Sequence, residues 1–350
     1  MTNIAILGFG VVGSGIYEVI KNAKKKPLSE VNIKYILDLR TFPDHPLGDR
    51  VTTDFDKILA DDEVKVVVET MGGTGAAYKF SLAALKAGKN VVTSNKACVD
   101  KYGAELDAAA AENGVTYLYE ASVGGGIPII YPLNTCFMGD DITRVAGILN
   151  GTTNYILTHM QSEGKTLEEA LKTAQELGFA EADPHSDLAG LDTARKISIL
   201  AGIAFDRYIS YEDIPCVEGI ENVTKEDIEL ADEMGCVIRL VAVAEKLSDN
   251  SARLLVAPHL VGRESLFYAI TEAFNAVSVT GSCVGEVVFY GQGAGSLPTA
   301  AAVCNDIERA ITGNCVTTVR ESCENGFLAE VPSDGEGFVT LKNGKKYRKF

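Results

Sequence analysis

Residues 3–20 read Asn-Ile-Ala-Ile-Leu-Gly-Phe-Gly-Val-Val-Gly-Ser-Gly-Ile-Tyr-Glu-Val-Ile. The apolar run at 3–7 predicts a buried strand, and the pattern at 14–20 predicts a helix. Between them lies a Gly-x-Gly-x-x-Gly sequence, in which the first glycine permits a tight turn, the second lets the backbone approach a diphosphate and the third allows close helix packing. The stretch therefore predicts a dinucleotide-binding fold with these cofactor contacts: Gly8, Phe9, Gly10, Val11, Val12 and Gly13.

Strand and helix patterns alternate up to about residue 119. Apolar runs and helical spacing predict strands at 31–37, 64–69, 89–93 and 116–119, and helices at 76–87 and 104–113. This alternation predicts an α/β fold with a doubly wound, Rossmann-type parallel sheet. Ligands of such sheets bind at the carboxyl ends of the strands. We therefore expect further cofactor contacts from the residues that follow two of these strands: Thr70, Met71, Ser94 and Lys96.

The strand at 31–37 ends at Asp38, and an acidic residue at this place in such folds binds the ribose hydroxyls of adenosine. Arg40 follows two residues later, and its guanidinium can pair with a 2′-phosphate. The two signals conflict, because the acid favours NAD(H) and the arginine favours NADP(H). The sequence favours NADP(H) slightly, with dual use as the alternative.

The pattern changes after about residue 134. Strands are predicted at 143–149, 237–244, 254–261, 275–280 and 286–290, with helices from Tyr155 onward, at 166–177, 196–204 and 224–234. This composition predicts a second region with a mixed sheet and helices. A glycine-rich turn at 291–295 then opens a helix that reaches about Thr312, so the chain is predicted to return to the cofactor side, with a cofactor contact from Gly293.

The predicted organisation has three parts. Residues 1–133, completed by 291–320, form a dinucleotide-binding domain, and residues 134–290 form a mixed α+β catalytic (substrate) and dimerisation region. Residues 321–350 form a C-terminal tail, which is either an ordered edge segment or a frayed end.

Residues 181–196 read Glu-Ala-Asp-Pro-His-Ser-Asp-Leu-Ala-Gly-Leu-Asp-Thr-Ala-Arg-Lys, a dense group of charges between apolar segments. Pro184 ends any preceding helix, and a new helix that starts near Ser186 to Gly190 places Asp192 and Lys196 at i and i+4 on one face. An isolated Asp-x-x-x-Lys pair is most often a solvated surface pair. Its occurrence in a chain with a nucleotide fold favours a catalytic pair instead.

Two further stretches carry polar groups at turns. Residues 150–154 read Asn-Gly-Thr-Thr-Asn, and they either cap the helix that follows or offer hydroxyls and amides to a polar substrate. Glu120 precedes three consecutive glycines, 124–126. Backbone carbonyls beside Glu120 could hold a hard cation, although a tight turn alone explains the glycines equally well.

The chain contains 32 basic and 48 acidic side chains, a formal net charge of −16. This charge disfavours nucleic acid and anionic membrane surfaces as partners. No secretory signal pattern opens the sequence and no apolar run approaches the roughly 20 residues of a membrane span, so we expect a soluble cytoplasmic protein. The eight cysteines and four histidines lack zinc-site spacing, and most cysteines are predicted to be reduced core thiols.

Several long motifs occur in the order found in one enzyme family, and the chain resembles homoserine dehydrogenases along most of its length. The matching segments are 8–13, 93–96, 120–130, 147–157, 181–196 and 291–300. The resemblance implies reversible reduction of L-aspartate 4-semialdehyde to L-homoserine with NAD(P)H, on the route to threonine, methionine and isoleucine. It also implies a homodimer.

The resemblance assigns roles to individual residues. Asp192 and Lys196 match the catalytic pair, and Lys96 matches the lysine near the reacting carbon. Substrate contacts are implied for Glu181, Asp187, Gly151, Thr152 and Tyr155. A monovalent cation site, usually for sodium, is implied at Glu120 and the carbonyls of Val123, Gly125 and Ile127.

Two features depart from the family pattern. Gln292 stands where the family has proline, and we expect it to be tolerated because only the glycines of this turn meet backbone constraints. No aspartokinase region and no C-terminal regulatory domain is visible, which puts feedback inhibition through such a domain in doubt.

The alternatives to homoserine dehydrogenase activity are a related reductase, such as aspartate-semialdehyde or L-aspartate dehydrogenase, and a cofactor-binding sensor. The lack of a Cys-His arrangement argues against the first of these reductases. Retention of Asp192, Lys196 and Lys96 argues against the sensor.

Overall fold

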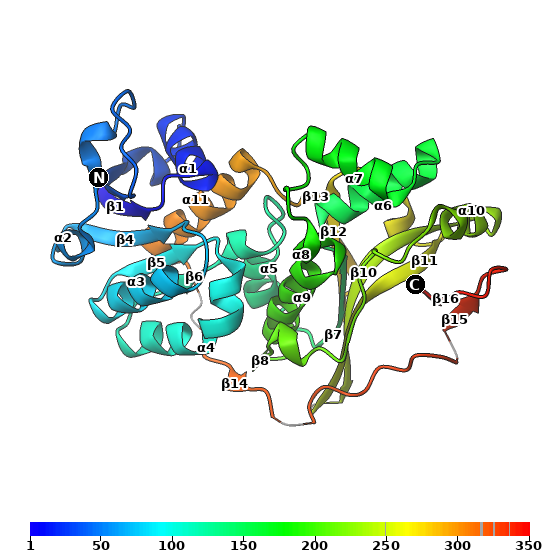
Figure 1. The fold of residues 1–350 in the computed structure, drawn as a ribbon. Coiled ribbons are helices and arrows are strands. Elements are labelled where there is room, and N and C mark those ends of the chain that lie inside the picture. The colour runs from blue at the N-terminus through cyan, green and yellow to red at the C-terminus, as the bar shows by residue number, and fades with distance from the viewer. Residues whose placement is uncertain (249, 316–317, 325, 336) are drawn as a thin grey trace. The chain divides into compact units, whose positions relative to one another are not determined.

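The computed structural model describes residues 1–350 with the exception of 249, 316–317, 325 and 336. The chain divides into two compact units. Unit 1 comprises Met1–Thr135 and Ala294–Ser322, and unit 2 comprises Cys136–Gly293 and Cys323–Phe350. Each unit contains a sheet of its own (Figure 1).

Unit 1 is built on a six-stranded sheet with the order β3-β2-β1-β4-β5-β6, in which every neighbouring pair is parallel. The strand order reverses between β1 and β4, and ligands of open parallel sheets bind at the carboxyl ends of the strands beside such a reversal. The strands of unit 1 are β1 (Thr2–Leu7), β2 (Val31–Leu37), β3 (Val51–Thr52), β4 (Val64–Glu69), β5 (Asn90–Thr93), β6 (Tyr117–Leu118) and, outside this sheet, β14 (Glu321–Ser322).

Helices cover both faces of this sheet, with α1 and α11 on one side and α3 and α4 on the other (Figure 1). The central strands are therefore apolar on both faces, as a parallel sheet requires. The helices of unit 1 are α1 (Val11–Lys21), α2 (Phe55–Leu59), α3 (Gly75–Lys86), α4 (Lys96–Glu112), α5 (Ile130–Thr135) and α11 (Ser296–Thr312), with short 3₁₀ turns η1 (Leu28–Glu30), η2 (Gly48–Arg50) and η3 (Glu120–Ser122).

The helix α11 is distant in sequence from the rest of unit 1, yet it packs along α1 (Figure 1). Gly15 makes this close approach possible, because a Cβ there would lie 2.8 Å from the Ser296 hydroxyl oxygen. Val303 and Ile307 of α11 join the same core as Ile4 and Ile6 of β1. The predicted return of the chain to this sheet thus has a physical basis in a shared apolar core.

Unit 2 contains a mixed sheet with the order β13-β12-β7-β10-β11-β16-β15, and β9 also pairs with β11. Pairs from β13 to β11 are antiparallel, whereas β9 and β16 run parallel to β11. The strands are β7 (Ile142–Ile148), β9 (Cys216–Val217), β10 (Cys236–Ser248), β11 (Ser251–Gly262), β12 (Phe274–Gly281), β13 (Gly285–Gln292), β15 (Phe338–Thr340), β16 (Lys346–Lys349) and the short β8 (Arg207–Tyr208).

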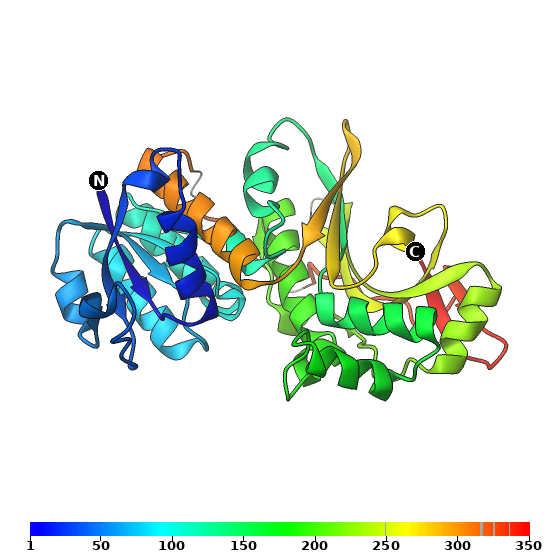
Figure 2. The same ribbon diagram turned by 90° about the horizontal axis from the view of Figure 1, so that it is seen from above.

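Helix α9 packs against β7 and β10, α6 packs against β10 and β12, and α7 packs on α6 (Figure 2). The other face carries an apolar cluster that includes Val241, Val261 and Phe267. The helices of unit 2 are α6 (Gly151–Glu163), α7 (Leu167–Glu176), α8 (His185–Leu188), α9 (Leu191–Ala204) and α10 (Lys225–Glu233), with the 3₁₀ turns η4 (Tyr211–Asp213) and η5 (Leu266–Ala269).

The predicted fold class is confirmed: a parallel Rossmann-type sheet is joined to a region with a mixed sheet. Two helices begin earlier than predicted, α4 at Lys96 and α6 at Gly151, because Asn95 and Asn150 cap them. The tail is an edge segment, since β16 and β15 extend the sheet. All eight cysteines are reduced thiols, but only Cys98 and Cys304 are buried, so the prediction of mostly core thiols is wrong.

Candidate active site

The charged stretch predicted at 181–196 forms two short helices, and α9 carries Asp192 and Lys196 one turn apart. The Lys196 ammonium nitrogen lies 2.7 Å from Asp192 Oδ2, and their side chains are 11% and 8% exposed. The same nitrogen donates to the Leu149 carbonyl oxygen at 2.7 Å. The pair is therefore a buried ion pair rather than the solvated surface pair that spacing alone favours.

Asn150 connects this ion pair to a second carboxylate. Its side-chain amide donates to Asp192 Oδ2 at 2.8 Å and to Asp187 Oδ1 at 2.7 Å. The amide oxygen of Asn150 meanwhile accepts from the backbone N–H of Thr153 and caps α6. One asparagine thus holds two carboxylates and a helix start in fixed relation; the sequence pattern indicated a cap or a substrate contact but not the link to the carboxylates.

Glycines set the backbone course of this stretch. Gly190 lies between α8 and α9 with φ of +79°, a left-handed conformation that glycine adopts at little cost. Gly219 lies so close to α8 that a Cβ would meet the Leu188 carbonyl oxygen at 1.8 Å. The neighbouring Ile220 donates its N–H to the same oxygen at 2.8 Å. Close backbone packing against Gly219 and Ile220 therefore fixes the segment that carries Asp187 and Asp192.

The predicted substrate residues lie in three settings within unit 2. Glu181 is exposed, and Asp187 is half-buried beside Asn150. Gly151 and Thr152 form the first turn of α6, where the Thr152 hydroxyl donates to the Phe179 carbonyl oxygen at 2.7 Å. Tyr155 is 3% exposed and its ring packs on Phe179.

The glycine-rich turn of unit 1 has the geometry that its sequence predicts. Gly8 has φ of +91°, and a Cβ on Gly13 would lie 2.3 Å from the Gly8 carbonyl oxygen. A Cβ on Gly10 would meet nothing within 4 Å, so the turn is open there. Val11 begins α1 and is 71% exposed, whereas Phe9 is buried. The turn thus presents the N-terminus of an 11-residue helix, which favours an anion.

Asp38 and Arg40, which gave conflicting signals about cofactor preference, form a hydrogen-bonded ion pair. The Arg40 side chain donates to both Asp38 oxygens, at 3.0 and 2.8 Å, and its guanidinium lies over the Phe42 ring. The backbone N–H of Phe9 also donates to Asp38, at 2.8 Å. The Arg40 guanidinium, with these N–H groups, holds the pKa of Asp38 well below its usual range. The Arg40 side chain remains 61% exposed.

The predicted contacts at the strand ends surround a buried acid that the sequence analysis did not single out. Glu69 ends β4, is 0% exposed and accepts hydrogen bonds from the Thr93 hydroxyl and the Met71 N–H, each at 2.6 Å. Burial raises its pKa to about 7, against the lowering effect of these hydrogen bonds. Thr70 donates to the Gly8 carbonyl oxygen at 2.8 Å, and Lys96 is the first residue of α4.

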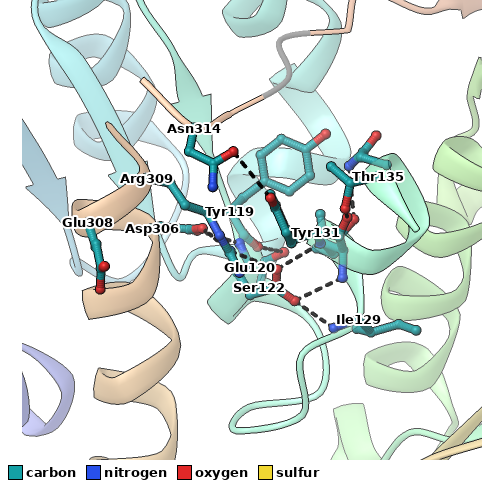
Figure 3. A network of polar contacts seen from close by, with 12 residues as sticks. Tyr119, Glu120, Ser122, Ile129, Tyr131, Thr135, Asp306, Glu308, Arg309 and Asn314 are labelled. Carbon is teal, nitrogen blue, oxygen red and sulfur yellow. Dashed lines mark hydrogen bonds and ion pairs between the residues drawn. The ribbon is translucent and has the colours of Figure 1, made fainter. Parts of the chain in front are cut away.

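Glu120 is the centre of a buried polar network (Figure 3). Its carboxylate accepts from the N–H groups of three residues at the start of α5, at 2.7, 2.8 and 2.7 Å: Ile129, Ile130 and Tyr131. Arg309 contacts the same carboxylate at 3.2 Å, and Asp306 accepts from the Glu120 N–H at 2.8 Å. The side chain of Glu120 is thus occupied by protein donors, which leaves its backbone carbonyl as the group that could face a cation.

The glycine turn after Glu120 carries the backbone carbonyls of the predicted cation site. Gly124 and Gly125 have φ of +77° and +54°. No backbone N–H of the described residues donates to the carbonyl oxygens of Val123, Gly125 or Ile127. Carbonyl oxygens are suitable ligands for a hard cation. The residues present therefore fit the predicted site.

Two family models match the chain. One, described as the NAD binding domain of homoserine dehydrogenase, matches residues 8–120, and the other, described as homoserine dehydrogenase, matches residues 128–307. The homoserine dehydrogenase of a Synechocystis species is 42% identical over 334 residues, which cover 93% of this chain and 76% of the relative. The chain belongs to the homoserine dehydrogenase family.

Further relatives agree in sequence and structure. The Bacillus subtilis homoserine dehydrogenase is 42% identical, over 87% of this chain and 71% of the relative. The crystal structure of a homoserine dehydrogenase from Thiobacillus denitrificans matches with a TM-score of 0.84 at 36% identity, over 95% of this chain and 79% of that chain. A hyperthermophilic archaeal homoserine dehydrogenase in complex with NADPH matches with a TM-score of 0.75 at 27% identity, over 89% and 98% of the two chains.

This homoserine dehydrogenase is an NAD(P)-binding oxidoreductase of amino-acid biosynthesis that interconverts L-aspartate 4-semialdehyde and L-homoserine. The predicted family, enzyme class and reaction are confirmed. None of the helices in the described part of the chain has both the length and the apolar character of a membrane span.

Proposed function

We propose that this homoserine dehydrogenase prefers NADP(H) and that the Asp192–Lys196 pair supplies the proton to the aldehyde oxygen. The observation that carries the proposal is the Lys196 ammonium, which is buried and held 2.7 Å from Asp192. Reduction adds a hydride from the cofactor to the aldehyde carbon, and the carbonyl oxygen gains a proton to become the homoserine hydroxyl. A positioned acid is needed at that oxygen.

Lys196 has the donors for this task. An ammonium carries three N–H groups, and Leu149 and Asp192 accept two of them, which leaves one to point at a substrate oxygen. Asp192 orients the ammonium and compensates its charge in a site with little water. Lys96 is the second candidate for the proton donor, since it lies at the start of α4 beside the predicted cofactor contacts.

The substrate is an amino acid, and its ammonium needs carboxylate partners. Glu181 is exposed and Asp187 is half-buried, so both can accept from a charged amine. The family resemblance adds Gly151, Thr152 and Tyr155, at the start of α6, to this substrate site. Asn150 keeps Asp187 and Asp192 apart and correctly oriented, because one amide donates to both carboxylates.

The cofactor is held by the turn at 8–13, with further contacts from Thr70, Met71, Ser94, Lys96 and Gly293. The preference for NADP(H) follows from Arg40, whose exposed guanidinium already neutralises Asp38. A 2′-phosphate would gain a bidentate cation and would not face an unpaired carboxylate. NAD(H) is the weaker alternative, because Asp38 must leave Arg40 before it can bind ribose hydroxyls.

A sodium ion at the carbonyls of Glu120, Val123, Gly125 and Ile127 and a homodimeric assembly complete the proposal. The dimer is supported by apolar side chains that unit 2 exposes, namely Leu266, Val284 and Tyr290 at 61%, 55% and 57%. Light scattering behind size-exclusion chromatography measures this assembly directly, and a monomer at micromolar concentration would refute it.

A spectrophotometric assay of the full chain tests the proposed roles. Homoserine oxidation is followed as absorbance of the reduced nicotinamide, with NADP⁺ and with NAD⁺. Lys196→Ala should lower kcat by about 10²–10⁴-fold while the Kd for NADPH stays within about threefold. Lys172→Ala, on the exposed face of α7, is the matched control. Unchanged kcat in Lys196→Ala would remove Lys196 from the mechanism.

A further inference from the structure

Glu69 occupies an unusual place for a carboxylate. It is the last residue of β4, between Leu7 of β1 and Thr93 of β5, at the carboxyl end of the sheet and beside the reversal of strand order. Its side chain is 0% exposed. Removal of a charged carboxylate from water costs on the order of several kcal/mol unless hydrogen bonds compensate it. A buried acid at this edge of the sheet is therefore a candidate for a functional role.

The hydrogen bonds of Glu69 lead to the start of α4. Its Oε2 accepts from the Thr93 hydroxyl at 2.6 Å, and that hydroxyl oxygen accepts from the Asn95 N–H at 3.0 Å. The Asn95 side chain caps α4 by accepting from the Cys98 N–H at 3.1 Å. Lys96 is the first residue of that helix. The chain of contacts thus runs from a strand end to the backbone that carries Lys96.

A second set of hydrogen bonds connects Glu69 and Asn95 to the turn that follows β4. Glu69 Oε1 accepts from the Met71 N–H at 2.6 Å, and the Asn95 amide donates to the carbonyl oxygens of Met71 and Gly73 at 3.3 and 2.7 Å. The turn at 70–73 and the start of α4 are therefore held to one carboxylate. Both oxygens of Glu69 face donors, an arrangement that suits an ionised carboxylate and that an amide cannot reproduce.

We propose that Glu69 is a positioning residue for the dehydrogenase reaction: through Thr93 and Asn95 it fixes the start of α4, and hence Lys96, against the turn at 70–73. This inference rests on the proposed role of Lys96 at the reacting carbon. A misplacement of about 1 Å of a group at the reaction centre can lower a rate by about 10²-fold, so a positioning residue is visible in kcat.

The groups that face Glu69 do not compete for its role. Burial and the charge of Glu69 raise the pKa of Cys98 on α4 to about 12. Burial, then Cys98 and then Glu69 raise the pKa of Tyr117 on β6 well above its usual value. Both groups are neutral near physiological pH. Glu69, whose pKa burial raises to about 7, is therefore the member of this cluster that titrates near neutral pH.

The test uses Glu69→Gln and Thr93→Val in the full-length enzyme. Glu69→Gln places an amide N–H against a donor, and Thr93→Val removes the hydroxyl link with little change in volume. Each should lower kcat by about 10–100-fold, with the Kd for NADPH and the KM for homoserine changed by less than about threefold. Asp227→Asn is the control, since Asp227 is also 0% exposed but belongs to the capping box of α10 in unit 2, where it accepts from the N–H of Thr224. It should lower the Tm and leave kcat unchanged.

A double-mutant cycle with Lys96→Ala separates this inference from the proposed function. If Glu69 acts through Lys96, Glu69→Gln should lower kcat by less than about threefold in the Lys96→Ala background. Full additivity would overturn the inference while leaving the role of Lys96 intact, and wild-type kcat in Lys96→Ala would refute that role instead. A Glu69→Gln enzyme that loses Tm but keeps kcat, like Asp227→Asn, shows a structural role only. If Glu69→Gln does not fold, Thr93→Val decides by the same criteria.

Discussion

The Lys196 ammonium nitrogen lies 2.7 Å from Asp192 Oδ2 on the same helix, with both side chains about nine-tenths buried. A buried ion pair is weak support for stability, because removing both charges from water costs about as much as their attraction returns. The pair also borders Asn150 and Asp187, so a substrate ammonium and a substrate carbonyl could be bound within one group of side chains. Stability alone therefore does not account for the pair, which supports the proposed catalytic role.

Asn150 gives the most direct test of this group. Asn150→Ser keeps a side-chain cap for α6 but removes the amide that bridges Asp187 and Asp192, so kcat/KM for homoserine should fall by about tenfold or more. Asn150→Asp also keeps the cap but places three carboxylates together, and the loss should be greater because like charges repel. Steady-state kinetics measure both, with Asn22→Ser in unit 1 as the control. Equal kinetics of Asn150→Ser and wild type would contradict the assigned role.

Arg40 determines cofactor preference if the pairing with Asp38 has the proposed meaning. Arg40→Ala should raise the KM for NADPH by about 10–100-fold, since one charge-assisted bidentate contact is worth about 1.5–3 kcal/mol. The KM for NADH should not rise, because Asp38 is then released to bind ribose hydroxyls. The Tm should not change, because the Arg40 side chain is 61% exposed. Equal effects on the two cofactors would mean that Arg40 does not read the phosphate.

Much of this molecule follows from its sequence. The strand before Gly8, the three glycines and the spacing of Asp192 and Lys196 are local patterns, and local geometry determines what they form. A Cβ on Gly13 would lie 2.3 Å from the Gly8 carbonyl oxygen, so this turn requires glycine at the last position of the motif.

The relations that the sequence did not reveal are contacts between distant segments. Asn150 and Asp187 are 37 residues apart, and Glu69 and Thr93 are 24 residues apart. In the sequence, Glu69 is simply the last residue of an apolar strand. Only the structure shows that two hydrogen-bond donors face its buried carboxylate, which indicates a functional role. Asn95 and Asn150 did have a local signal as N-caps, and giving that signal more weight places the starts of α4 and α6 correctly.

Glu120 should be needed for the shape of the proposed cation-binding turn, residues 123–127, rather than for binding the ion by its side chain. Glu120→Gln replaces an acceptor of three N–H groups and breaks the contact with Arg309, so the Tm should fall and the activation by NaCl over a choline salt should weaken by about tenfold. Glu308→Gln is the control, because Glu308 is exposed and points away from this network in Figure 3. Retained sodium activation in a Glu120→Gln enzyme of normal Tm would refute the assignment.

The pH dependence of the free energy of unfolding should include a contribution from Glu69. Burial raises its folded-state pKa from 4.5 to about 7, so between these values the folded chain holds a proton that the unfolded chain lacks. Stability from this group is therefore lost as pH rises from about 4.5 to 7, by about 3 kcal/mol. Asp306, whose pKa burial and the charge of Glu120 raise to about 7, acts in the same direction, so the wild-type curve contains both contributions.

The difference between wild type and Glu69→Gln isolates the first of these contributions, because glutamine does not titrate. Chemical denaturation at about pH 5 and about pH 8 should show that wild type loses more stability than Glu69→Gln over this interval, by about 2–3 kcal/mol. Hydrogen exchange of amides in β4 and β5 assigns the change to unit 1. Parallel curves for the two proteins would mean that Glu69 ionises with an ordinary pKa, and the cost inferred from its burial would then be wrong.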